Sequence, residues 1–90
     1  MNFQQLRIVH ETVRRNFNLT EVAAALFTSQ SGVSKHIKDL EDELGLELFI
    51  RKGKRLLGLT EPGEELAVVV DRMLMDARNI KGIAAQFSNK

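Results

Sequence analysis

The stretch from Gln30 to Lys38 carries side chains that can recognise the edges of nucleic-acid bases. If it is helical, five polar side chains share one side of its first turns, namely Gln30, Ser31, Ser34, Lys35 and Lys38. Glutamine can bond to an adenine edge, lysine to a guanine edge, and serine to either a base or a phosphate. None of the five is acidic, so this side is suited to approach a polyanion. The alternative is an ordinary amphipathic helix whose polar side is solvated.

A dense basic cluster follows the predicted helix and reads Arg-Lys-Gly-Lys-Arg. Before it, Leu46, Leu48 and Ile50 recur at a period of two, which predicts a short extended segment with Phe49 on the opposite side. A glycine turn and a second extended run over residues 56–59 complete a β-ribbon. Its tip cations would touch phosphates or enter a narrow minor groove, unless the tip is only a solvated hairpin. These cations are Arg51, Lys52, Lys54 and Arg55.

The arrangements that would indicate an enzyme are excluded. Ser34, His36 and Asp39 have the residue types of a hydrolase triad, but residues two apart on a helix point about 160° away from each other. The two histidines lie far apart and the chain has no cysteine, so no zinc site is recognisable. A glycine-rich phosphate loop is also missing from the sequence. We therefore expect no enzymatic activity, no metal and no cofactor.

Two short helices joined by a tight turn would position the polar side chains of residues 30–38. Asn18 can cap the first of them, and Thr28 or Ser29 can cap the second. A further helix over residues 3–15 precedes the pair. This is the arrangement of a helix-turn-helix, whose second helix enters the major groove by its N-terminal end. The second helix also carries an apolar stripe for the core, formed by Val33, Ile37, Leu40 and Leu44.

The last predicted element is a long helix that begins near Thr60, which can act as its N-cap. From residue 66 to residue 87, apolar side chains follow a 4-3-4-3-4-3 spacing, which is a heptad seam. The preceding domain is too small to cover such a helix, so we expect the seam to pair with a second copy. The alternative is a helix that lies partly on its own domain. The seam consists of Leu66, Val70, Met73, Ala77, Ile80, Ala84 and Phe87.

The composition allows one small domain and one extended element. The 90 residues are 43% hydrophobic and 28% charged, which is ordinary for a soluble globular chain. The net charge of +1 argues weakly against a general polyanion binder, although the distribution of charge matters more. The absence of cysteine is compatible with a reducing cytoplasm. Since no run of about 18 apolar residues and no signal peptide occur, we expect a cytoplasmic chain without a membrane partner.

The run TSQSGVSKHIKDLEDELGLELFIRKGKRLLGLTEPG resembles the signature of the LysR-type transcriptional regulators. The similar features are Ser-Gln after the turn, a serine–basic pair, Leu-Glu-x-Glu-Leu-Gly, Leu-Phe, a basic wing and Leu-Thr-x-x-Gly. Within the family, NFQQL, TSQSGVSK, LEDELG and GKRLLGLTEPG are similar to the CysB and Cbl regulators of sulfur assimilation. Two positions depart from the common pattern: Ser31 stands where many members have proline, and Lys35 stands where arginine is frequent.

The resemblance implies a mainly α fold, with a winged helix-turn-helix over residues 1–59 and a linker helix over residues 60–90. It implies that two linker helices pair antiparallel in a homodimer, and it leaves a tetramer open for the full-length regulator. It also implies wing contacts to DNA outside the major groove. Contacts in the groove are implied for Ser29, Gln30, Ser31, Ser34 and Lys35, to which we add Thr28 and Lys38.

The expected partners are double-stranded operator DNA and a second copy of the chain. A small-molecule effector would bind an effector domain that lies outside these residues. The resemblance to the CysB and Cbl regulators implies control of sulfur, cysteine or sulfonate metabolism genes. The rival interpretation is a protein-interaction module with a coiled-coil arm, which would show an apolar or acidic recognition surface. The polar and basic side of residues 30–38 favours DNA.

Overall fold

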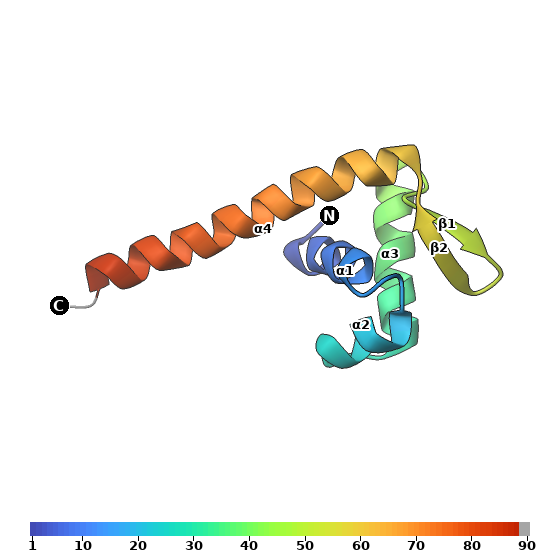
Figure 1. The fold of residues 1–90 in the computed structure, drawn as a ribbon, viewed down its shortest axis with the longest axis horizontal. Helices are drawn as coiled ribbons and strands as arrows, with labels where there is room; N and C mark the ends of the chain where they lie inside the picture. The colour runs from blue at the N-terminus through green and yellow to red at the C-terminus, as the bar shows by residue number, and fades with distance from the viewer. Residues whose placement is uncertain (89–90) are drawn as a thin grey trace.

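The computed structural model describes residues 1–88, which form four helices and a two-stranded antiparallel sheet (Figure 1). Helix α4 crosses over α1 and extends well beyond it, while the sheet projects beside α3 (Figure 1). The predicted mainly α winged helix-turn-helix is therefore confirmed. Residues 89 and 90 of the expected linker helix lie outside the described residues. The elements are α1 (Phe3–Arg14), α2 (Leu19–Ala25), α3 (Gln30–Leu44), β1 (Phe49–Lys52), β2 (Arg55–Leu59) and α4 (Glu61–Ser88).

The helix-turn-helix begins and ends at the capping residues. Asn18 Oδ1 accepts a hydrogen bond of 3.2 Å from the Glu21 amide at the start of α2. Of the two candidate caps for α3, Ser29 fills the position, because its Oγ accepts from the Gly32 amide at 3.0 Å. Gly45 ends α3 with φ 70°, a left-handed conformation that glycine adopts without steric cost.

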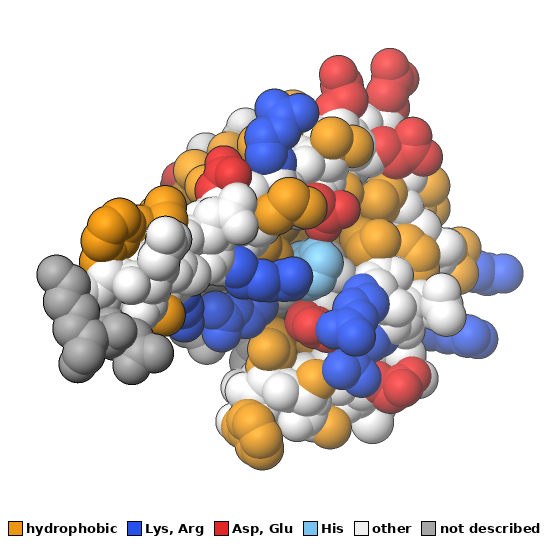
Figure 2. All heavy atoms as spheres, turned by 60° about the vertical axis from the view of Figure 1, so that its left-hand side comes forward, with side chains coloured by type: hydrophobic (Ala, Val, Ile, Leu, Met, Phe, Trp, Pro, Cys, Tyr) orange, Lys and Arg blue, Asp and Glu red, His pale blue; other side chains and the backbone are white. Residues whose placement is uncertain are grey.

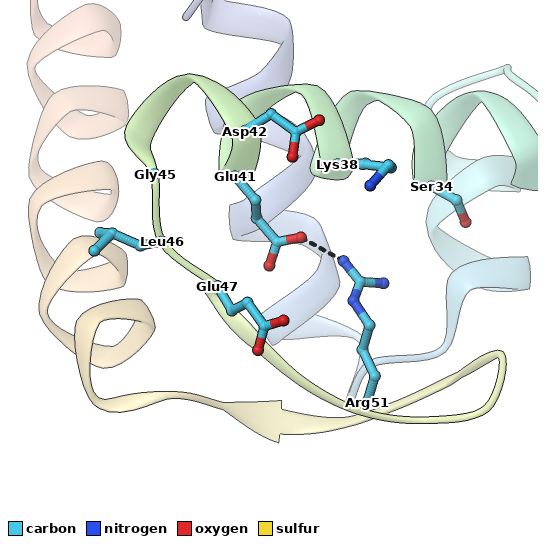
Figure 3. Close-up of a pocket in the computed structure, with 8 residues that line it drawn as sticks. All are labelled: Ser34, Lys38, Glu41, Asp42, Gly45, Leu46, Glu47 and Arg51. Atoms are coloured by element: carbon cyan, nitrogen blue, oxygen red, sulfur yellow. Dashed lines mark hydrogen bonds and ion pairs between the residues drawn. The ribbon is translucent and has the colours of Figure 1, made fainter.

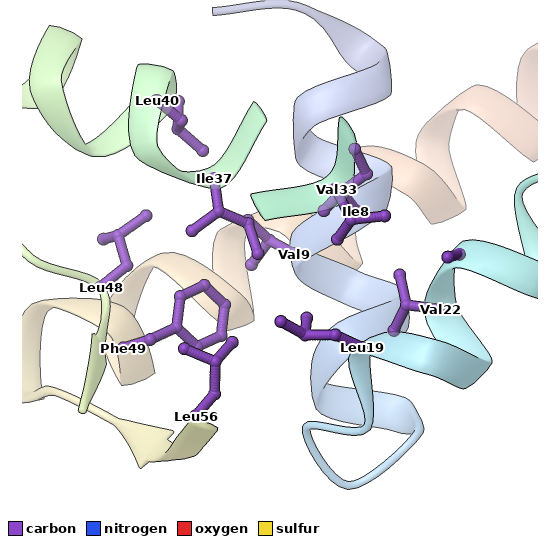
Figure 4. Packing of buried hydrophobic residues seen from close by; sticks show 11 residues of the cluster. Ile8, Val9, Leu19, Val22, Val33, Ile37, Leu40, Leu48, Phe49 and Leu56 are labelled. Carbon is purple, nitrogen blue, oxygen red and sulfur yellow. The ribbon is translucent and has the colours of Figure 1, made fainter. Parts of the chain in front are cut away.

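The main core lies where α1, α2, α3 and the base of the sheet meet (Figure 4). Val33, Ile37 and Leu40 are at most 1% exposed, so the apolar stripe predicted for α3 faces this core. The rings of Phe17 and Phe49 meet edge to face with centroids 6.2 Å apart, which joins the loop after α1 to the sheet. The buried members are Ile8, Val9, Leu19, Val22, Ala23, Val33, Ile37, Leu40, Leu48, Phe49 and Leu56.

The alternation predicted before the basic tip is wrong. Leu48 and Phe49 are successive and both buried, at 0% and 1% exposure, whereas Leu46 and Ile50 are exposed at 46% and 48%. Strand β1 starts only at Phe49, and its register with β2 shifts between Ile50 and Arg51. Leu48 precedes the strand and is not part of its pleat, so Leu48 and Phe49 can both face the core, and the extra residue of the register shift is Leu57 in β2.

The first half of α4 packs on α1, and the second half leaves the domain. Val70 and Leu74 form a small second core with Leu6 of α1, and Leu66 packs against both cores. Past residue 74, the described part of α4 is exposed except for Ala77, which is half-buried. At 1.5 Å per residue, this exposed part is about 20 Å long. The body of the domain thus covers only one end of α4.

A tight joint connects the sheet to α4. The Thr60 hydroxyl donates to the Glu47 carbonyl at 2.6 Å and accepts from the Gly63 amide at 3.1 Å, while the Thr60 amide donates to the Leu48 carbonyl at 3.0 Å. A Cβ atom on Gly63 would lie 2.0 Å from the Leu48 carbonyl oxygen. The backbone of α4 therefore approaches the loop before β1 more closely than any residue with a side chain allows.

Candidate nucleic-acid interface

The first turns of α3 present the predicted recognition residues to solvent, because the core stripe occupies the other side of the helix. Gln30, Ser31, Lys35 and Lys38 are exposed and Ser34 is half-buried. The structure therefore brings these five side chains together on one accessible side.

Two weak interactions involve these side chains. Lys35 Nζ lies 3.4 Å from Asp39 Oδ2, and both side chains are largely exposed. Such a surface pair is worth little in water, so the ammonium group remains available to another anion. The Gln30 Oε1 atom accepts from the Thr20 hydroxyl at 3.5 Å, a long bond that leaves the amide NH₂ free to donate.

The turn before α3 has a structural role in addition to the predicted DNA contacts. Ser29 is exposed, but its Oγ caps α3 and lies 3.2 Å from the Ser31 hydroxyl. Thr28 is half-buried, and its Oγ1 would lie 3.1 Å from a Cβ placed on Gly32. Phe27 adopts φ 55° in this turn and is 96% exposed. A contact from Ser29 to DNA would use the hydroxyl proton, since its oxygen already accepts from the helix.

The wing cations fall into two groups. Lys52, Lys54 and Arg55 are exposed around a left-handed glycine at φ 62° and form no ion pair with the described residues. Arg51 is different, because its Nη2 bonds to Oε1 of Glu41 on α3 at 2.5 Å. The sequence-based prediction treated all four cations alike, whereas the structure ties one of them to the domain.

Glu41 is the residue at this interface that sequence reasoning missed. Its Oε2 accepts from the Leu48 amide at 2.7 Å and from the Phe49 amide at 3.3 Å, in addition to the bond from Arg51 to Oε1. Its charge predicts exposure to solvent. The available signals were its position four residues after Ile37, at the border of the apolar stripe, and an arginine ten residues later.

A cleft of about 690 Å³ separates α3 from the wing (Figure 3). Ser34 and Lys38 line one end, Asp42 and Glu47 line the other, and Arg51 reaches across from the wing. The electrostatic character therefore changes along the cleft from donor-rich to acidic. A phosphate chain is favoured only at the end near the start of α3.

The structure divides the predicted heptad seam in two. Val70 is 1% exposed and Leu66 is half-buried, so these two residues pack on the chain's own domain. Ile80 and Phe87 are 68% and 65% exposed. Hydrophobic side chains are visible along the free part of α4 (Figure 2). The surface that is open to a second copy is therefore shorter than the seam read from the sequence.

Two kinds of site are absent from the described residues. Within residues 1–88, no group of three or more histidine or acidic side chains is placed to hold a metal ion. None of the described helices is long and apolar enough to cross a membrane.

The fold and the side chains on α3 define the chain as a winged helix-turn-helix nucleic-acid-binding domain with a long C-terminal helix. Residues 3–64 match the model of the bacterial regulatory helix-turn-helix proteins of the lysR family. The chain belongs to this family and provides its helix-turn-helix DNA-binding domain.

Three curated relatives are named transcriptional regulators. The regulator SsuR of Burkholderia cenocepacia is 64% identical over 90 residues, which are 100% of this chain and 29% of SsuR. The regulator cbl of Escherichia coli K12 is 61% identical over 99% of this chain and 28% of its own length. The regulator CysB of B. cenocepacia is 52% identical over 98% of this chain and 28% of its own length. All three relatives are named as transcriptional regulators and none as an enzyme, in agreement with the expected absence of enzymatic activity. The chain spans less than a third of their length.

Solved structures confirm the fold. The complex of the BenM DNA-binding domain with catB site 1 DNA superposes with a TM-score of 0.90 and 22% identity, covering 100% of this chain and 98% of that one. Full-length OxyR C199D from Pseudomonas aeruginosa gives a TM-score of 0.86 at 28% identity, covering 96% of this chain and 28% of OxyR.

Proposed function

We propose that the chain binds operator DNA sequence-specifically as the N-terminal part of a transcriptional regulator. In this proposal the first turns of α3 enter the major groove and the wing lies on the adjacent backbone. The observation that carries the proposal is the accessible, non-acidic side of α3, where an amide, two hydroxyls and two ammonium groups lie together. The residues assigned to direct contact are Thr28, Ser29, Gln30, Ser31, Ser34, Lys35, Lys38, Lys52, Lys54 and Arg55.

We further propose that two copies pair through the free part of α4. Met73, Ile80 and Phe87 are at least 38% exposed, and the last two lie on the part of α4 that extends past the domain. Ala77 and Ala84 lie between them and allow a close approach of two backbones. Leu66 and Val70 support this surface from the side of the domain, because they anchor α4 to α1.

The regulated genes are proposed to serve sulfur, cysteine or sulfonate metabolism. The support is the 52–64% identity to SsuR, cbl and CysB over nearly the whole chain, together with the resemblance of the recognition sequence to sulfur-assimilation regulators. A regulator of chromosomal genes works in the cytoplasm. An effector would bind a separate domain of the full-length protein.

The test is selection of duplexes by the protein from a random pool, followed by titration of the selected and scrambled sequences at several salt concentrations. We expect tighter binding to the selected duplex and a linear fall of log K with log salt. Equal binding to both duplexes would contradict sequence recognition. Binding to neither would favour the rival protein-interaction module.

A further inference from the structure

Glu41 places a nearly buried carboxylate in the cleft between the recognition helix and the wing. Its side chain is 8% exposed and receives hydrogen bonds from two backbone amides and one guanidinium group. A buried carboxylate is costly unless its oxygens are bonded and its charge is paired. All three donors come from the segment of residues 48–51, which begins the wing. The carboxylate therefore holds that segment at three of its four residues.

The three bonds determine where the wing starts and how it is directed. The bonds to the Leu48 and Phe49 amides hold the two successive residues whose side chains both enter the core. The bond to Arg51 then ties strand β1 back to α3 across the cleft (Figure 3). Lys52 and Lys54 follow within three residues, so their positions relative to α3 depend on these bonds.

From this geometry we infer that Glu41 is a positioning residue for DNA binding, and that Arg51 is its link to the wing and not a phosphate contact. This inference rests on the proposed DNA binding. The Arg51 side chain is 37% exposed and its guanidinium group is already engaged with a nearly buried anion. A phosphate would have to compete with that anion for Arg51, whereas Lys52 and Lys54 carry charges that no described residue neutralises.

The experiment compares Glu41→Gln, Arg51→Gln, the double variant and wild type on the selected duplex across a range of salt concentrations. Without the link, Lys52 and Lys54 no longer reach their phosphates together. We expect each single variant to raise Kd by roughly tenfold and to flatten the slope of log K against log salt by about two units. The double variant should be no worse than either single variant, because both remove the same link. Hydroxyl-radical footprints should lose protection at the wing position and keep it in the major groove.

Two matched controls separate positioning from simple charge. Asp42→Asn raises the net charge by the same amount as Glu41→Gln, in the same cleft, but Asp42 is exposed and bonds to none of the described residues. It should bind as tightly as wild type or tighter, with the wing footprint intact. Lys52→Gln removes one proposed phosphate contact and should flatten the slope by about one unit. Thermal unfolding of each variant identifies the folded fraction used in the titrations.

Three results would overturn the inference. Tighter binding by Glu41→Gln would mean that the carboxylate acts only by repelling DNA. A loss of one unit of slope in Arg51→Gln, with Glu41→Gln unchanged, would make Arg51 a phosphate contact. Additive losses in the double variant would show that the two residues act independently and not through one link.

If Glu41→Gln does not fold, the Arg51→Gln variant alone decides, because it leaves both amide bonds to Glu41 in place. Failure of wild type to discriminate duplexes would instead contradict the proposed function.

Discussion

Gln30 and Lys35 differ from the wing cations in the kind of loss that their removal should cause. Both are exposed on the first turns of α3, where an amide and an ammonium group can meet base edges. A base contact discriminates between sequences, whereas a phosphate contact holds any duplex. Comparison of cognate and random DNA therefore shows which role each side chain has.

We expect Gln30→Ala and Lys35→Ala each to cost about 1–3 kcal/mol of binding free energy on the selected duplex, and less on random DNA. Fluorescence anisotropy on the two duplexes at one salt concentration measures both values. Asp39→Ala is a control, because it removes only the weak pair with Lys35. Equal losses on the two duplexes would assign Gln30 and Lys35 to the phosphates.

Glu11 on α1 connects protonation to stability. Burial raises its pKa, but the hydrogen bond and charge of Arg15 and the charge of Arg14 outweigh that effect and hold the pKa below 4.5, its ordinary value. A carboxyl group with a lowered pKa stabilises the fold above its unfolded-state pKa, and the contribution is lost as pH falls through the lower folded-state value. Glu11→Gln should therefore reduce stability at neutral pH and flatten its decline below about pH 4.5. Urea unfolding at a series of pH values measures this, and an unchanged decline would contradict the assignment.

At the scale of the elements, the joint between the wing and α4 fixes the direction of the long helix. The joint depends on Thr60, which bonds to the loop before β1 and caps α4, and on Gly63, which lets the two backbones meet. The Leu-Thr-x-x-Gly motif thus has a steric explanation as well as a capping one. It holds the sheet and α4 in one rigid arrangement.

We expect Gly63→Ala to destabilise the domain by about 1–3 kcal/mol, because its Cβ must displace the Leu48 carbonyl. Denaturant unfolding measures the loss. Gly82→Ala is the matched control in the same helix: a Cβ there meets nothing within 4 Å, and alanine should stabilise α4 by up to about 1 kcal/mol. A neutral Gly63→Ala variant would show that the joint can open without cost.

At the scale of the whole molecule, one domain reads only a few base pairs, which gives little selectivity among competing genomic sites. Two copies at a fixed separation read two half-sites. At about 100° per residue, Ile80, Ala84 and Phe87 share one side of α4, which is turned by roughly 90° from Val70 and Leu74. The helix can therefore pack on its own domain and on a second copy at the same time.

Ile80→Asp should place an unpaired charge in the proposed dimer contact and weaken dimerisation by roughly a hundredfold or more. Sedimentation should then show monomers, and affinity for a full operator should fall towards that for a half-site. Met75→Asp is the control, since Met75 is 59% exposed but lies about 140° around the helix from Ile80. A normal dimer in the Ile80 variant would move the contact to another surface.

Sequence alone determined the order of the elements, the cap of α2 and the side of α3 that faces solvent. Each rests on local physics: Asn18 satisfies a free amide, and the 3.6-residue period separates core from solvent. The position of the basic tip followed from its glycine turn for the same reason. These features depend on neighbours within a few residues, so the local pattern contains the information.

Only the tertiary structure decided what covers each apolar side chain and which group each charged side chain is paired with. The spacing of Val70 and Ile80 is the same heptad pattern, but α1 covers the first and leaves the second exposed. Phe49 is buried in the core where its amide bonds to Glu41, and Arg51 is held by that same carboxylate. The spacing of residues in the sequence identifies an apolar stripe, and the residue types identify the charges. The groups that contact this stripe and these charges come from other elements of the fold, because packing is a property of the assembled chain.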